Sequence, residues 1–179
     1  MRIRTYRFED VSTLEHLQQL AIANDQLAPE SVDILMAWLD NVAHESKANV
    51  FVIRDDDDEL NTWGQAGTLD GIEGEVVGYT TIEVQYDDRA YHLRCMGTVH
   101  PEHRRHNGGR LLLVAALNRA RMLAAEFEFE AEQAGQPIYF EALLPVLDPA
   151  SPRLAARCEM LPTDEPAPTG LRLYRRELW

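Results

Sequence analysis

Residues 96–112 read MGTVHPEHRRHNGGRLL, and this stretch decides how the fold is interpreted. Its first four residues end an apolar segment typical of a β-strand, residues 91–99, and its last residues open a long segment with helical spacing. A turn at the start of a helix gathers unpaired backbone N–H groups at the positive end of the helix dipole. Gly108 and Gly109 let an anion approach closely, and Asn107 tolerates left-handed backbone. The stretch therefore predicts a loop that binds phosphate, with a diphosphate as its natural ligand.

The charge of the whole chain makes this loop stand out. The 179 residues carry a formal charge of -13, yet Arg104, Arg105, His106 and Arg110 lie close together in the loop. So acidic a chain argues against a nucleic-acid partner. The loop also lacks the Lys-Ser/Thr ending of a nucleoside triphosphatase loop and the three spaced glycines of a dinucleotide fingerprint. Both of those ligand classes are therefore disfavoured.

Outward from the loop, the patterns predict alternating strands and helices. Alternating or compact apolar runs predict strands at 2–6, 49–54, 75–84, 91–99, 138–144 and 171–178. Helices are expected after Asp10 and Ser12, after Pro29, from the loop to Gly135, and from Asp148 to about Met160. The order β-α-α-β-β-β-α-β-α-β is typical of a mixed sheet flanked by helices. The length fits a single domain, 1–179.

Other features narrow the class of protein. Two cysteines, Cys95 and Cys158, are too few for a disulfide framework or a zinc site, and we expect no metal. The run of four aspartates from Asp55 lacks the spacing of a calcium loop and predicts a solvated loop. No apolar run approaches the length of about 18 residues that spans a bilayer. Because Met1 is followed by no secretory signal, the sequence predicts a cytoplasmic protein without membrane contact.

The loop and its flanks resemble the GNAT N-acetyltransferase superfamily. That family has a strand ending in Val-x-Pro, then Arg/Gln-x-x-Gly-x-Gly/Ala, then a long helix, and this chain has Val99-His100-Pro101 followed by residues 104–109, RRHNGG. Residues 74–79 and 148–151 extend the resemblance more weakly. It implies an α/β (α+β) fold: a mixed, mostly antiparallel central sheet of six to seven strands, flanked by about four helices.

The resemblance also implies a function. The chain would be an N-acetyltransferase that uses acetyl-CoA (coenzyme A) to acylate a primary amine by direct attack. The acceptor would be a small molecule or a peptide, and a homodimer is left open. The backbone of residues 105–110 would hold the pyrophosphate, and two strand residues would pair with the pantetheine arm between splayed strands. The implied cofactor-binding residues are Thr98, Val99, Arg104, Arg105, His106, Asn107, Gly108, Gly109 and Arg110.

The catalytic residues are less clearly marked. A carboxylate could take the amine proton, directly or through water; Glu83 is the first candidate and Glu141 the second. Where many relatives have a tyrosine that protonates the departing thiolate, this chain has Ala155, so Tyr139 is a candidate replacement. The alternative is an acyl-CoA-binding module of the same fold with weak or lost catalysis. By family analogy, Trp38, Trp63 and the first two helices would shape the acceptor pocket.

Overall fold

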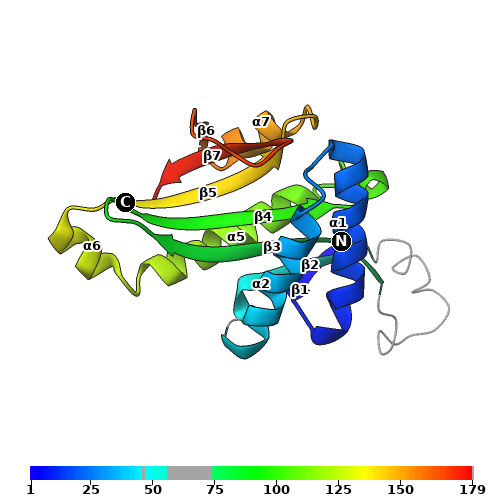
Figure 1. Ribbon diagram of the computed structural model, residues 1–179, viewed down its shortest axis with the longest axis horizontal. Helices are drawn as coiled ribbons and strands as arrows, with labels where there is room; N and C mark the ends of the chain where they lie inside the picture. Colours follow the sequence, from blue (N-terminus) through cyan, green and yellow to red (C-terminus); the bar gives the residue numbers. More distant parts are fainter. Residues whose placement is uncertain (46, 56–73, 179) are drawn as a thin grey trace, which may run out of the picture.

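The computed structural model describes residues 1–45, 47–55 and 74–178. Its described residues form one seven-stranded sheet in the order β1-β2-β3-β4-β5-β7-β6 (Figure 1). The predicted aspartate-rich loop beyond Asp55 and the predicted pocket residue Trp63 lie outside the described residues. The strands are β1 (Arg2–Thr5), β2 (Val50–Asp55), β3 (Glu75–Tyr86), β4 (Tyr91–Val99), β5 (Ile138–Pro145), β6 (Leu161–Pro162) and β7 (Leu171–Glu177).

The pairing confirms the expected mixed sheet. Only β4 and β5 pair in parallel; the other neighbours in the sheet are antiparallel. The parallel pair is possible because a helical connection carries the chain from the end of β4 back to the start of β5. The sequence did not predict β6, because its two residues are too few to show the alternating pattern of a strand.

The described part of the chain contains five α-helices, close to the expected four. They are α1 (Val11–Asp25), α2 (Ser31–Glu45), α5 (Gly108–Ala124), α6 (Glu128–Ala134) and α7 (Ser151–Arg157), with short 3₁₀ turns at Phe8–Asp10, Lys47–Asn49 and Pro101–His103. The helix expected to run from the loop to Gly135 is broken between α5 and α6. At the break, Phe127 stacks on Tyr91 of β4, with ring centroids 4.5 Å apart. This tertiary contact outweighs the local helical pattern.

Two helical layers cover the sheet, with α1 and α2 on one face and α5 on the other (Figure 1). On the first face, Leu14 and Leu17 of α1 pack with α2 against β2 and β3. Trp38 packs against this cluster, so it contributes to the core there. On the second face, Leu113 and Leu117 of α5 pack against the inward residues of β3, β4 and β5. Helices therefore pack on both faces of the sheet, and the loop before α5 follows β4, its central strand.

Candidate functional site

The loop between β4 and α5 has two left-handed residues just before the start of a helix, an arrangement typical of an anion nest. Asn107 immediately precedes α5 with a φ of 65°, as its residue type suggested, and Arg105 has a φ of 74°. Left-handed backbone is uncommon for a residue other than glycine and is found where the surroundings impose it. Alternation of left- and right-handed residues turns successive N–H groups toward one side of the chain. The loop therefore offers main-chain donors at the head of the longest described helix.

The two loop glycines have different roles. A Cβ at Gly108 would lie 2.6 Å from Ile53 Cδ1, so Gly108 allows α5 to pack closely on the sheet. A Cβ at Gly109 would meet only Leu154 Cδ2, at an ordinary distance of 3.6 Å. Gly109 lines a cavity, and its missing side chain leaves the first turn of α5 open to it. The sequence analysis predicted that both glycines let an anion approach the backbone closely.

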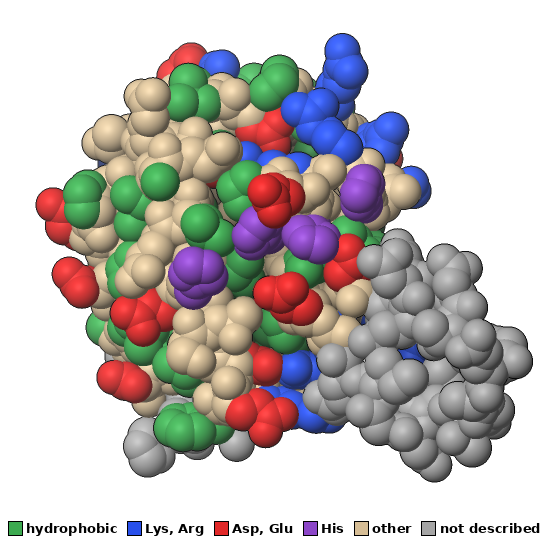
Figure 2. All heavy atoms as spheres, turned by 90° about the vertical axis from the view of Figure 1, so that its right-hand side faces the viewer, with side chains coloured by type: hydrophobic (Ala, Val, Ile, Leu, Met, Phe, Trp, Pro, Cys, Tyr) green, Lys and Arg blue, Asp and Glu red, His purple; other side chains and the backbone are tan. Residues whose placement is uncertain are grey.

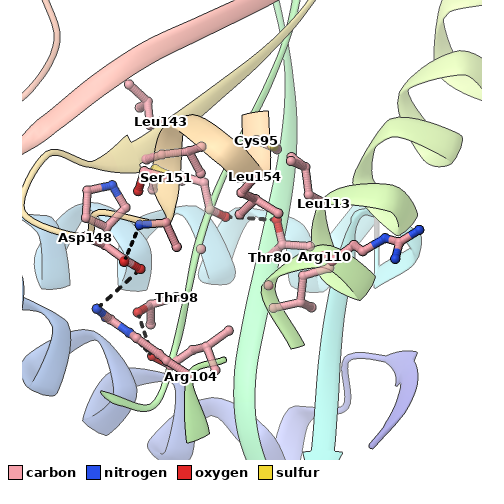
Figure 3. A pocket seen from close by; sticks show the side chains of 18 of the residues that line it. Thr80, Cys95, Thr98, Arg104, Arg110, Leu113, Leu143, Asp148, Ser151 and Leu154 are labelled. Carbon is pink, nitrogen blue, oxygen red and sulfur yellow. Dashed lines mark hydrogen bonds and ion pairs between the residues drawn. The ribbon is translucent and has the colours of Figure 1, made fainter. Parts of the chain in front are cut away.

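The cavity continues from the loop into a gap between two strands. β4 and β5 stay in register only from Tyr91↔Ile138 to Cys95↔Ala142. Beyond that pair the strands separate, and residues 96–99 of β4 and 143–145 of β5 line a cavity of about 360 Å³ (Figure 3). β4 remains paired with β3 as far as Val99, so only its edge toward β5 is open. A slender chain with amide groups could pair with that edge.

The walls of the cavity combine arginines with apolar side chains. All the expected cofactor-binding residues except His106 and Gly108 line it. Helix α7 and the turn before it contribute residues that the sequence reading did not assign: Asp148, Ser151, Arg153, Leu154 and Arg157. Asp148 is the only acidic side chain among the described lining residues. The cavity is therefore strongly cationic in a chain whose net charge is -13.

Arg104 fixes the loop to the rest of the protein. Its guanidinium donates to both carboxylate oxygens of Asp25 at 2.8 and 2.6 Å, and its Nε donates to the Val99 carbonyl. Asp25 is only 1% exposed, and its hydrogen bond raises the pKa of Arg104. Arg104 is thus committed to α1, although the sequence placed it among the phosphate contacts.

We predict that Arg104→Met lowers the free energy of unfolding by about 3–5 kcal/mol, because it leaves a buried carboxylate without its partner. Arg105→Met should change it by less than about 0.5 kcal/mol, because that side chain is 63% exposed. Urea denaturation of both variants checks this. Equal midpoints for the two variants would contradict it.

A second anchor joins the loop to β2. His103 Nδ1 lies 2.7 Å from a carboxylate oxygen of Asp55, and the rings of His100 and His103 meet edge to face. Figure 2 shows histidine and acidic side chains gathered on this end of the molecule, with a group of Lys or Arg side chains beyond them. Contacts to α1 and to β2 therefore hold the loop from two sides.

Asp148 lies between the loop and α7. It accepts from the backbone N–H of Ala150 at 2.9 Å and from Arg105 at 3.3 Å, and Arg104 lies 4.0 Å away (Figure 3). Its position beside the nest means that an incoming phosphate would compete with this carboxylate for Arg105. Arg105 is the loop arginine best placed to exchange partners, because Arg104 is already committed.

The structure does not bring the three candidate catalytic residues to the cavity wall. Glu83 is exposed and accepts a hydrogen bond from Gln85. Tyr139 is half-buried beneath Arg175, whose Cζ lies 4.7 Å from the ring centre. Neither residue lines the cavity, and neither does Glu141. Their catalytic roles stay predictions.

Glu141 lies at the centre of a buried ionic cluster. Arg94 of β4 donates to one carboxylate oxygen at 2.8 Å, Arg175 of β7 donates to the other, and His92 Nδ1 lies 2.9 Å from it. Burial alone would raise the pKa of Glu141, but hydrogen bonds from His92, Arg175 and Arg94 together lower it. A carboxylate with a lowered pKa is a weak proton acceptor, so the geometry favours a structural role for Glu141.

The missing tyrosine leaves no hydroxyl at its position. Ala155 is a residue of α7 that is fully buried in the core and does not line the cavity. Cys95 does line the cavity, but burial strongly raises the pKa of its thiol and keeps it neutral. The hydroxyls at the cavity wall come instead from the side chains of Thr80, Thr98, Ser151 and Tyr79. Tyr79 donates to Gln18, Thr80 to the Met96 carbonyl and Thr98 to the Val99 carbonyl.

No family model and no curated protein matches the sequence. Solved structures do, and they have the fold of GNAT acetyltransferases. A GNAT superfamily phosphinothricin acetyltransferase from Sinorhizobium meliloti, in complex with AcCoA, is similar at a TM-score of 0.65 and 15% identity, over 99% of this chain and 88% of that one. A ribosomal-protein-alanine N-acetyltransferase from Brucella melitensis reaches 0.62 at 16% identity, over 99% and 100%. A chain of the NatC complex bound to Gag peptide and CoA reaches 0.59 at 10% identity, over 97% and 94%.

These likenesses confirm the GNAT fold that the sequence motif predicted. At such identities they establish the fold alone. Separately, no helix in the described part of the chain is long and apolar enough to cross a membrane.

Proposed function

We propose that this chain is an acetyl-CoA-dependent N-acetyltransferase that acts on a primary amine of a small molecule or a peptide. One observation carries the proposal: the backbone nest at the head of α5 and the gap between β4 and β5 are parts of a single cavity. The cationic end suits a diphosphate. The narrow end, with an open strand edge and apolar walls from Leu113, Leu143 and Leu154, suits a pantetheine arm.

The described residues fit such a cofactor. Gly109 leaves room at the first turn of α5, where a diphosphate would accept from the N–H groups of residues 107–110. Arg105 would exchange Asp148 for phosphate oxygens. The free edge of β4 at Thr98 and Val99 would pair with the amides of the arm. Bound acetyl-CoA supplies the acyl group as a thioester.

The chemistry then needs mainly positioning. The amine nitrogen attacks the thioester carbonyl, the C–N bond forms, the C–S bond breaks, and the amine proton leaves as the thiol is released. The chain would hold the carbonyl near the point where β4 and β5 separate and exclude water with the apolar wall. The net charge of -13 favours cationic amines over acidic acceptors.

A specific observation supports a second candidate function, an acyl-CoA-binding module with weak or lost catalysis. Among the described cavity residues there is no histidine, and the single carboxylate, Asp148, is already paired. With Ala155 buried at the tyrosine position, the described cavity residues offer Ser, Thr and Tyr79 hydroxyls and the neutral Cys95 thiol as proton carriers.

Thermal unfolding with acetyl-CoA, followed by an assay for amine-dependent CoA release, separates the two candidates. At a ligand concentration one hundred times its Kd, acetyl-CoA should stabilise the fold by about 2.7 kcal/mol, which raises Tm by several degrees. Release of CoA that depends on a particular amine supports the transferase. Stabilisation without release across a broad amine panel supports the binding module. An unchanged Tm at saturating acetyl-CoA contradicts both.

A further inference from the structure

Helix α7 brings two arginines to the cavity. Arg153 and Arg157 are four residues apart, so they lie one above the other on the same side of the helix. Both are exposed, and both line the cavity. The pair therefore forms part of the cavity wall.

Arg110 of α5 lies close to the same place. Arg110 also lines the cavity, and its charge acts on the thiol of Cys158, the residue directly after Arg157. Burial raises the pKa of Cys158, while Arg176 and Arg110 oppose that rise. Arg110 and the two arginines of α7 therefore line one and the same cavity. We call Arg110, Arg153 and Arg157 the outer arginine group.

The outer arginine group is distinct from the loop end of the cavity. Figure 3 shows the Arg110 side chain on the side of the cavity away from Asp148 and Arg104. The loop arginines already have acidic partners, since Arg104 pairs with Asp25 and Arg105 with Asp148. Within residues 1–45, 47–55 and 74–178, no carboxylate forms an ion pair with the outer arginine group. Its cations are available to a second anion.

Coenzyme A carries two separate phosphate centres: the diphosphate, and a monoester on the 3′-oxygen of its ribose. A monoester phosphate has close to two negative charges at neutral pH, and arginine binds such groups through paired, charge-assisted hydrogen bonds. Two cation groups in one cavity match two phosphate centres in one ligand. We propose that Arg110, Arg153 and Arg157 bind the 3′-phosphate and make the protein select CoA over 3′-dephospho-CoA. This inference rests on the proposed function.

Isothermal titration of the wild-type protein with CoA and with 3′-dephospho-CoA tests the proposal directly. Charge-assisted contacts at partly exposed positions should give CoA an advantage of about tenfold to one hundredfold at 0.1 M salt. The advantage should fall as salt rises, because exposed charges are screened. The two ligands differ only in the phosphate monoester, so the comparison isolates that group without any change to the protein.

The double variant Arg153→Gln/Arg157→Gln locates the effect. It should lose most of the wild-type preference for CoA, because only Arg110 of the group remains, while its affinity for 3′-dephospho-CoA stays unchanged. Arg121→Gln is the matched control, because Arg121 is an exposed arginine of α5 that does not line the cavity. It should keep the wild-type preference. Circular dichroism melts check that the variants are folded.

The outcomes separate this inference from the proposed function. If the wild type binds the two ligands equally well, the outer arginine group is not a 3′-phosphate site. The proposed binding of acetyl-CoA is then unaffected. A wild-type preference that survives in the double variant assigns the 3′-phosphate to other residues and also overturns it. Failure of the wild type to bind either ligand overturns both the inference and the proposed function.

Discussion

Glu141→Gln should lower the free energy of unfolding at pH 7 by about 3–5 kcal/mol, the usual cost of removing one partner from a buried ionic cluster. The side chain of Glu141 is 0% exposed, and two arginines and a histidine converge on its carboxylate. An amide of the same shape cannot balance the charges of Arg94 and Arg175. Urea denaturation measures the change, and Glu83→Gln on an exposed strand position is the control, expected within about 0.5 kcal/mol of wild type.

The difference in stability between wild type and Glu141→Gln should depend on pH. The pKa of Glu141 is lower in the folded protein than its ordinary value of 4.5. A group of this kind stabilises the fold fully above its unfolded pKa and loses that contribution as pH falls through the folded pKa. The gap in stability between wild type and Glu141→Gln should therefore be largest at pH 6–7 and shrink progressively below about pH 4.5.

These measurements also decide between the two roles of Glu141. If Glu141 is the general base, its glutamine variant should keep wild-type stability and lose amine acylation. If Glu141 instead balances the charges of the ionic cluster, its glutamine variant should lose stability. A variant as stable as wild type at pH 7 would contradict the account of the cluster.

Gly109→Asp should abolish CoA binding, with a loss of affinity of at least about one hundredfold, while the protein stays folded. The new side chain has space, because a Cβ at this position meets only Leu154 at 3.6 Å. Aspartate is also favourable in the first turn of a helix. Its carboxylate would occupy the open side of that turn and repel a diphosphate there. The matched control is Gly109→Ala, which adds the Cβ without the charge and should keep affinity within about tenfold of wild type.

Titration with CoA and thermal melts of the two Gly109 variants are both needed. If Gly109→Asp binds CoA with wild-type affinity, the diphosphate does not bind at the head of α5. A melt well below that of wild type would show instead that this position is needed for folding, against the space that the structure leaves there.

Local signals in the sequence were sufficient for the loop and for six of the seven strands. Asn107, beside two glycines at the end of a strand, predicted a left-handed residue at a helix start, and it is found there. The positive φ of Arg105 carried no such signal, because an arginine takes that conformation only when the surrounding structure imposes it. The commitment of Arg104 to Asp25 joins residues far apart in the chain, so no local pattern could indicate it.

Catalytic candidates were harder to predict for the same reason. Glu141, Arg94 and Arg175 lie on three different strands, and only the register of the sheet brings them together. The spacing of Arg153 and Arg157 was visible in the sequence, but their place on the cavity depends on how α7 packs beside β5. The break before α6 likewise depends on the stacking of Phe127 on Tyr91.

A crystal structure grown with coenzyme A would show where the diphosphate and the pantetheine arm bind. We expect the diphosphate to accept hydrogen bonds from main-chain N–H groups of residues 107–110, and the pantetheine arm to lie between β4 and β5 beside Thr98 and Val99. Coenzyme A bound elsewhere would contradict this expectation, as would a complex in which those N–H groups are paired with protein atoms and the strand gap is closed.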